Sequence, residues 1–468
     1  MTSLDQDRLF PIEPQARHIA RELYYTIHDL PIISPHGHTD PAWFATNASF
    51  SDPARLFVTP DHYILRMLFS QGIAFEKLGV PCVDGYPVEK DGRKIWRLFA
   101  ENYFLFRGTP SQLWIDHALS DIFDIGRKLD ADTADDIFDE VAEKLSQNAF
   151  RPRALYDRFR IEVLATTDNA LDTLQHHKSI HRSGWGGRII PTYRPDAIID
   201  PDKPHWSANL DQLADLTNCD TGTWQGYLDG HRARRRDFIA MGATATDHGH
   251  PDALTAVLPD AEAEKLFDKI RGGNGTSDDH ALFRAQMLTE MAAMSIDDGL
   301  VMQLHAGSLR NHAPDILARF GADRGFDIPQ RTDFVTALRP LLMRYGLDPR
   351  LTLILFTLDE TTYSRELAPL AGAYPALRLG PAWWFFDSPE GMIRYRQTVT
   401  ETAGFYNTVG FNDDTRAFCS IPARHDVARR VDAAYLATLV ATGRLGRAEA
   451  DEVAQDLTYD LAKQAYRL

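Results

Sequence analysis

The sequence contains few cysteines, no long hydrophobic run and no excess of positive charge. Its three cysteines, Cys82, Cys219 and Cys419, lie far apart and show no CxxC spacing, which excludes a disulfide framework and predicts reduced thiols in a cytoplasmic protein. The longest apolar stretches, such as Leu351–Phe356, are much shorter than the roughly 20 residues of a membrane-spanning helix. The N-terminus carries early acidic residues and no apolar core of a signal peptide, so we expect no secretion signal.

Basic residues are outnumbered by acidic ones. The chain of 468 residues has 50 Lys and Arg against 66 Asp and Glu, a formal net charge of -16. This balance opposes non-specific binding of nucleic acid and of anionic membranes, although a local cluster of arginines could still bind a small acidic molecule. We therefore expect a small-molecule partner and neither a nucleic-acid nor a membrane partner. For a soluble enzyme of this size we also expect a homo-oligomer.

The chain shows no repeats, low-complexity segments or flexible linkers, which argues against independent modules joined by a tether. Instead, short apolar or β-branched runs that end in polar residues alternate with helical stretches. Eight such runs cover residues 31–34, 162–167, 188–193, 241–247, 300–305, 351–356, 377–384 and 406–413. Eight β/α units predict a closed parallel barrel with its active site at the carboxyl ends of the strands. A doubly wound open sheet is the alternative.

The gap between the first two predicted strands is far longer than one β/α connection. We therefore expect a helical insertion at residues 41–154, and a barrel domain with C-terminal helices formed by residues 1–40 and 155–468. Helical periodicity is clear at residues 61–72, from residue 132 onward and at residues 424–468. Residues 200–216 are rich in Pro, Asp and Asn and predict a loop after the third strand.

His36 and His38 follow the first predicted strand. Residues i and i+2 of a strand point to the same face, so the two imidazoles project together and could form half of a metal site. Asp414, after the eighth strand, would lie beside the first strand in a closed barrel and could supply an oxygen ligand. The alternative is that one histidine caps a turn, the other is solvated, and Asp414 caps a helix.

Polar side chains also follow most of the other predicted strands, which predicts one shared polar site. His305 is a further ligand, an acid or base, or a core histidine bonded to a carbonyl. Arg194, Arg310 and Arg416 could clamp a substrate carboxylate bidentately, although any single arginine is more commonly part of a surface ion pair.

Eight motifs then occur in a characteristic order along nearly the whole chain. They are His36-Gly37-His38, Asp61-His62-Tyr63 followed by Arg66-Met67, Ala165-Thr166-Thr167-Asp168, Arg194-Pro195-Asp196, Thr246-Asp247-His248, His305-Ala306-Gly307-Ser308-Leu309-Arg310-Asn311, Gly380-Pro381-Ala382-Trp383-Trp384-Phe385 and Asp414-Thr415-Arg416-Ala417-Phe418. Each motif is moderately specific, and the ordered set is strong. The chain thereby resembles the uronate isomerases, the glucuronate/galacturonate isomerase branch of the amidohydrolase superfamily.

The resemblance implies a distorted (β/α)8 barrel with a large helical insertion after strand one that covers the barrel mouth. It also implies interconversion of D-glucuronate with D-fructuronate and of D-galacturonate with D-tagaturonate. Members of the superfamily that hydrolyse their substrates usually carry additional His or Lys ligands, whereas residues 351–357 end without a histidine and no strand-four lysine is evident. The resemblance therefore implies a single, weakly held divalent metal, zinc, rather than a two-metal hydrolytic site, and whether the metal is essential stays open.

The implied mechanism is proton transfer between C2 and C1 through an enediol. The resemblance assigns metal binding to His36, His38 and Asp414, catalysis to Asp414, Arg416, His62, Tyr63 and His305, and substrate binding to Arg194, Arg310, Asp247, Trp383 and Trp384. Whether Asp414 is a ligand, a base or both stays open. Two other functions compete: a metal-dependent hydrolase of an amide, ester or lactone, and a sugar-acid-binding protein without catalysis.

Overall fold

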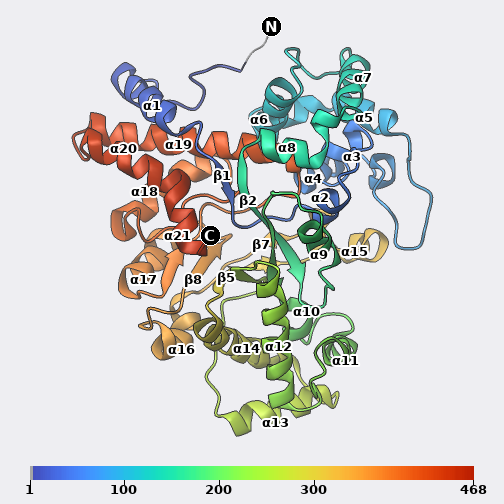
Figure 1. Ribbon diagram of the computed structural model, residues 1–468, viewed down its shortest axis with the longest axis vertical. Coiled ribbons are helices and arrows are strands. Elements are labelled where there is room, and N and C mark those ends of the chain that lie inside the picture. The colour runs from blue at the N-terminus through green and yellow to red at the C-terminus, as the bar shows by residue number, and fades with distance from the viewer. Residues whose placement is uncertain (1–3) are drawn as a thin grey trace.

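Seven parallel strands form the central sheet of the computed structural model, which describes residues 4–468 (Figure 1). Their order in the sheet is β1-β2-β3-β4-β5-β8-β9, which is the order of the chain. The strands are β1 Ile32–Ser34, β2 Ile161–Asn169, β3 Ile189–Arg194, β4 Ala245–His248, β5 Val301–Ala306, β8 Leu353–Thr357 and β9 Leu377–Leu379. Seven of the eight predicted runs therefore overlap a strand, and the predicted parallel β/α architecture is confirmed.

The eighth predicted strand, residues 406–413, is reduced to one isolated parallel bridge between Thr408 and Leu379. Gly410 has a positive φ angle, and this left-handed position interrupts the repeating ladder of a strand, while Asp414 directly after the run also has a positive φ. The segment still links β9 to the residues after β1, because the backbone N–H of Asp414 donates to the carbonyl of His36 and the N–H of His38 donates to the carbonyl of Thr415. The ring of strands is thus closed at its carboxyl end by a few hydrogen bonds.

Between β1 and β2 the chain is helical and contains no strand among the described residues. Helices α2 Pro41–Thr46, α3 Pro53–Phe57, α4 His62–Ser70, α5 Gly92–Glu101, α6 Pro110–His117, α7 Ala134–Leu145 and α8 Pro152–Arg158 lie together in the upper right of Figure 1. Aspartates at the N-caps of α2, α3, α4 and α5 accept backbone N–H groups, so the sequence fixes where these helices begin. Residue 154, the predicted insertion boundary, lies within α8, and the division into domains stays a prediction.

Further helices connect the later strands and cover the sheet. They are α9 Gln175–Arg182, α10 Asp196–Ile199, α11 Trp206–Thr217, α12 Trp224–Ala240, α13 Asp260–Arg271, α14 Ser277–Asp298, α15 Pro314–Phe320, α16 Val335–Tyr345, α17 Ala368–Ala373 and α18 Pro389–Ala403. The prediction of a loop at residues 200–216 is wrong, because α11 occupies most of it. The last proline of this stretch is Pro204, and Trp206, Leu210 and Leu213 are then buried at helical spacing.

A short hairpin and the C-terminal helices complete the fold. Strands β6 Ser308–Leu309 and β7 Ile328–Pro329 pair antiparallel after β5 and hold the intervening loop over the sheet. The C-terminal helices are α19 Ile421–Ala441, α20 Arg447–Gln455 and α21 Leu461–Tyr466, and the first helix is α1 Pro14–Ile27. Helix α1 packs on α19 and α20, so both ends of the chain share one apolar cluster, and the helical prediction for residues 424–468 is confirmed.

A buried polar cluster lies between β2 and α9. The Thr166 hydroxyl is 2.6 Å from Asp168 Oδ2 and 2.9 Å from His177 Nε2. Burial raises the pKa of Asp168 from 3.8 to about 7, although the hydrogen bond from Thr166 opposes the shift. Between these two pH values the folded protein keeps a proton that the unfolded chain has released, so stability falls as the pH rises through this window.

Replacing Asp168 with Asn therefore stabilises the protein most at about pH 8 and clearly less at about pH 5, which lies near the lower end of this window. The upper limit of the gain is about 4 kcal/mol, at about 1.4 kcal/mol per pKa unit. Urea unfolding of both proteins at the two pH values measures the difference in free energy of unfolding. A gain of the same size at both pH values would contradict a raised pKa at Asp168.

Candidate functional site

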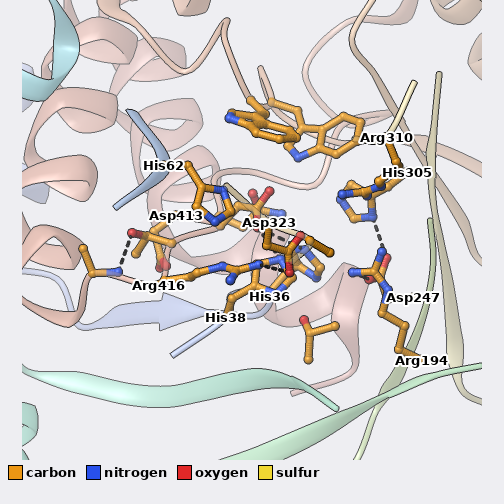
Figure 2. A pocket seen from close by; sticks show the side chains of 18 of the residues that line it. His36, His38, His62, Arg194, Asp247, His305, Arg310, Asp323, Asp413 and Arg416 are labelled. Atoms are coloured by element: carbon orange, nitrogen blue, oxygen red, sulfur yellow. Dashed lines mark hydrogen bonds and ion pairs between the residues drawn. The ribbon is translucent and has the colours of Figure 1, made fainter. Parts of the chain in front are cut away.

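A cavity of about 550 Å³ opens at the carboxyl ends of the strands. It collects side chains from five strand ends, from α4 of the inserted helices and from the loop between β6 and β7 (Figure 2). All twelve residues to which the sequence assigned a role line this cavity: His36, His38, His62, Tyr63, Arg194, Asp247, His305, Arg310, Trp383, Trp384, Asp414 and Arg416. Their placement together is a fact of the structure, whereas their individual roles stay predictions.

His36, His38 and Asp414 meet at the bottom of the cavity. His36 Nε2 lies 3.3 Å and His38 Nε2 3.1 Å from Asp414 Oδ1. The three potential ligand atoms lie within 4.8 Å of one another. Asp414 Oδ1 is buried and accepts no hydrogen bond of good geometry. A buried carboxylate oxygen that faces two imidazoles is costly without a partner, and the set has the donor chemistry of a zinc ligand group.

A second group of potential ligands shares His36. His305 Nδ1 lies 2.6 Å from Asp247 Oδ1, and the His305 ring stacks on that of His36 with the centroids 4.5 Å apart. His36, Asp247 and His305 also lie within 4.8 Å of one another by their ligand atoms, and His305 Nε2 is buried without a hydrogen-bond partner. Together the two groups offer three imidazoles and two carboxylates as potential ligands in this part of the cavity.

The two buried carboxylates of these groups are both held in the charged form. Burial raises the pKa of Asp414, but the imidazoles of His36 and His38 outweigh burial and hold that pKa well below its usual range. Burial likewise raises the pKa of Asp247, and Arg194 and His305 outweigh it. Ionised carboxylates in a low-dielectric site attract a cation strongly.

The backbone around the His-x-His pair is fixed by close contacts. The Thr167 hydroxyl donates to the carbonyl of Gly37 at 2.9 Å. A Cβ at Gly37 would lie 3.4 Å from Asp413 Oδ1, so the backbone at Gly37 packs directly against Asp413. Asp413 Oδ2 in turn lies 3.1 Å from His425 Nε2. The strand end that carries the two histidines is thus held from both sides.

His62 and Tyr63 enter the cavity from the first turn of α4, where Asp61 caps the helix. Figure 2 shows the His62 ring facing the group formed by His36 and His38. Burial and the nearby Arg416 lower the pKa of His62 to about 3. The imidazole of His62 is therefore neutral near pH 7 and has one nitrogen that can accept a proton.

Arg194 and Arg310 differ in how far protein partners already occupy their guanidinium groups. Arg194 donates from Nε to Asp196 at 2.8 Å, its Nη1 lies 3.1 Å from Asp247 Oδ2, and its Nη2 packs against Gly249. Arg310 donates from Nη1 to Asp327 at 2.8 Å and keeps 28% of its side chain exposed. Because more of its guanidinium is free, Arg310 has the better access to an anionic ligand.

The two tryptophans line different parts of the cavity wall. Trp383 is 6% exposed, and its ring meets that of His305 edge-on with the centroids 4.6 Å apart. Trp384 stacks on Phe385 at 4.7 Å and lies near His62. Trp383 therefore fixes His305, while Trp384 bounds the space beside His62.

Comparison with known proteins decides the family. The family model described as glucuronate isomerase matches residues 12–466. The chain belongs to this family. A uronate isomerase from Rhizobium meliloti (strain 1021) is 64% identical over 465 residues, 99% of each chain, and one from Brucella suis biovar 1 (strain 1330) is 61% identical over 466 residues, 100% of each.

Solved structures agree with this assignment. The crystal structure of glucuronate isomerase from Caulobacter crescentus matches with a TM-score of 0.98 at 58% identity and covers 100% of this chain and 97% of that one. The uronate isomerase from Thermotoga maritima matches with a TM-score of 0.92 at 27% identity over 100% of both chains. The protein is an isomerase of hexuronates, as predicted, and the hydrolase alternative is not favoured. No helix among residues 4–468 is long and apolar enough to cross a membrane.

Sequence reasoning gave no role to several charged residues that line the isomerase cavity, among them Asp323 and Arg424. Asp323, in the loop between β6 and β7, accepts a hydrogen bond from Arg416 at 3.1 Å. Burial raises the pKa of Asp323, but Arg416 outweighs burial and holds that pKa below its usual range. Arg424, on α19, forms an ion pair with Asp387. Neither residue follows a strand or forms a motif, so no local signal in the sequence marked them.

Proposed function

We propose that this isomerase moves a proton between C2 and C1 of an open-chain hexuronate and that one divalent ion, zinc, binds to His36, His38 and Asp414. The observation that supports the metal is the donor set: two imidazoles converge on Asp414 Oδ1, a buried oxygen without a hydrogen bond. Three ligands with a remaining open position are typical of catalytic zinc. When bound, the ion polarises an oxygen of the substrate.

Asp414 serves as both ligand and base through its two oxygens. The imidazoles approach Oδ1, which leaves Oδ2 for the substrate. Oδ2 takes the proton from C2 of the aldose, the C–H electrons form the C1–C2 double bond, and the aldehyde oxygen becomes the enediolate oxygen. Arg416, two residues along the same segment and in the same cavity, stabilises this negative charge.

His62 and Tyr63 complete the isomerisation. The neutral imidazole of His62 accepts the proton of the C2 hydroxyl and returns a proton to the C1 oxygen, assisted by the Tyr63 hydroxyl. Asp414 then delivers its proton to C1, which leaves the ketone at C2. The sum of the steps moves hydrogen within the sugar and consumes no co-reactant. During ring opening, His305 gives a proton to the ring oxygen or takes the proton of the C1 hydroxyl.

The substrate carboxylate binds to Arg310 and Arg194. Arg310 is the main donor because its guanidinium has one carboxylate partner, whereas that of Arg194 has two. Asp247 receives substrate hydroxyl groups or holds Arg194 and His305 in place. Trp384 forms the wall on the side of His62, and Trp383 supports His305. We further propose D-glucuronate and D-galacturonate as substrates and a homo-oligomer in the cytoplasm, where free cysteines stay reduced.

Removal of the ion tests the metal part of this proposal. Treatment with a strong chelator should lower the conversion of D-glucuronate to its ketose by about 10-fold or more, and added zinc should restore it. Metal content and melting temperature, measured on the same samples, should fall and recover together with activity. Full activity at a metal content near zero would contradict the proposed role of the metal. It would not contradict proton transfer by Asp414, which the variants of that residue test.

A further inference from the structure

Asp387 and Arg424 form a buried ion pair in the wall of the cavity that joins three separate parts of the chain. Arg424 Nη1 donates to Asp387 Oδ2 at 2.6 Å. Asp387 follows the tryptophan motif after β9, and Arg424 lies in the first turn of α19. Both side chains line the cavity, and neither lies among the residues to which the sequence assigned a role.

Asp387 also contacts the inserted helices through Tyr63. The Tyr63 hydroxyl donates to Asp387 Oδ1 at 2.6 Å, and the backbone N–H of Phe385 donates to the same hydroxyl at 2.9 Å. Phe385 has a φ of 69°, a left-handed backbone that is unfavourable for an aromatic residue. The guanidinium of Arg66, also on α4, lies 4.6 Å from the Phe385 ring centroid. Helix α4 and the aromatic loop therefore hold each other in place.

Arg424 extends the network to the segment that carries Asp414. Its Nη1 also donates to the carbonyl of Asp413 at 3.3 Å, and its Nε donates to Ser420 Oγ at 3.3 Å. Its guanidinium lies 3.5 Å from the ring centroid of Trp114, on α6 of the inserted helices. Residues 406–413 form only an isolated bridge with β9, so the bonds from Arg424 add to the backbone hydrogen bonds with His36 and His38 in placing Asp414.

We infer that the Asp387–Arg424 pair is a positioning element for the isomerisation, which orients the Tyr63 hydroxyl from one side and the Asp414 segment from the other. The inference rests on the proposed roles of Tyr63 and Asp414. The two oxygens of Asp387 each accept one hydrogen bond, from Tyr63 and from Arg424. The carboxylate therefore fixes the orientation of both donor side chains. Neither residue needs to touch the substrate, so the pair acts on turnover through its neighbours.

The structure supplies a matched control. Arg396, on α18, donates from Nε and Nη2 to the two oxygens of Asp432, on α19, at 2.6 and 2.9 Å. This pair is as buried as the first one, with side-chain exposures of 5% and 7% against 5% and 12%. It does not line the cavity. Asp432→Asn therefore costs stability in the same way as Asp387→Asn without disturbing the site.

The test measures kcat and KM for D-glucuronate in Asp387→Asn, Asp432→Asn, Tyr63→Phe and the double variant Asp387→Asn/Tyr63→Phe, each corrected for folded protein. Asp387→Asn should lower kcat by about 10- to 100-fold with KM changed by less than about threefold, as expected for misplaced catalytic groups. Asp432→Asn should stay within about twofold of the wild type in both constants. The loss of kcat in the double variant should be smaller than the product of the two single losses, because Asp387 acts in part through that hydroxyl.

Two conservative variants keep the test decisive if Asp387→Asn does not fold. Asp387→Glu retains the charge and should recover part of kcat, and Arg424→Lys retains the charge but replaces the planar fork, so its kcat should fall without loss of the fold. If Tyr63→Phe is impaired but Asp387→Asn or Arg424→Lys has the wild-type kcat, the positioning role of the pair is overturned. Wild-type kcat in Tyr63→Phe would instead overturn the proposed role of Tyr63.

Discussion

Asp414→Asn should lower the turnover of D-glucuronate by about a thousandfold or more, because the substitution removes both the base and a charged metal ligand. Asparagine has nearly the same shape, so the loss cannot come from a cavity. The asparagine amide cannot take the proton from C2. It also lacks the negative charge that the carboxylate places next to the imidazoles of His36 and His38. Conversion to the ketose, followed by proton NMR, measures the effect.

Asp413→Asn is the matched control for this change. Asp413 is the adjacent residue, is equally part of the cavity wall, and pairs with His425 instead of with the His-x-His pair. We expect a clearly smaller loss of kcat, about 10-fold, since its effect is on the local backbone. Equal losses in the two variants would contradict the assignment of the base to Asp414. Metal content should fall in Asp414→Asn and stay near the wild-type value in Asp413→Asn.

Arg310→Met should lower kcat/KM for D-glucuronate by about 10- to 100-fold, mainly through KM. A hydrogen bond to a charged group contributes about 1.5 to 3 kcal/mol, and methionine keeps the apolar stem of the side chain without the charge. The same substitution should weaken inhibition by D-gluconate more than inhibition by its neutral alcohol, D-glucitol, because only the acid uses the guanidinium. Inhibition constants for the two compounds measure this difference.

Arg350→Met provides the control, since Arg350 is an exposed arginine that pairs with Asp348 away from the cavity. It should leave kcat/KM unchanged within about twofold, as for other surface ion pairs. Arg310→Lys should recover part of the lost affinity because it keeps one charged donor. An equal loss of D-gluconate and D-glucitol binding in Arg310→Met would show that the carboxylate lies elsewhere.

The parts of the fold that the sequence predicted are those with a local cause. The strands show themselves as apolar runs because they are buried on both faces, and His36 and His38 share a face because the strand repeat is two residues. The helix at residues 206–217 was missed because the polar composition before it masked the buried positions Leu210 and Leu213. The eighth strand was overestimated because positive φ angles at Gly410 and Asp414 leave little trace in a hydrophobic pattern.

The part of the site that could not be predicted depends on pairings between distant segments. Arg416 meets Asp323, which is 93 residues away in sequence, only after the loop between β6 and β7 folds over the strand ends. Tyr63 and Asp387 are separated by 324 residues. Such contacts are set by tertiary packing, and neither strand ends nor helix caps indicate them. The sequence thus predicted the site residues at the strand ends, whereas their charged partners from distant segments were found only in the structure.

The fate of deuterium at C2 of D-glucuronate tests the central claim most directly, namely that the cavity isomerises its substrate by proton transfer from C2 to C1 through Asp414. With [2-²H]glucuronate, the wild-type enzyme should show a primary isotope effect on kcat/KM, with deuterium partly at C1 of the ketose and partly lost to water. Asp414→Asn should release no deuterium above the uncatalysed rate. Turnover without an isotope effect and without any loss of label, or label release that persists in Asp414→Asn, would contradict the account.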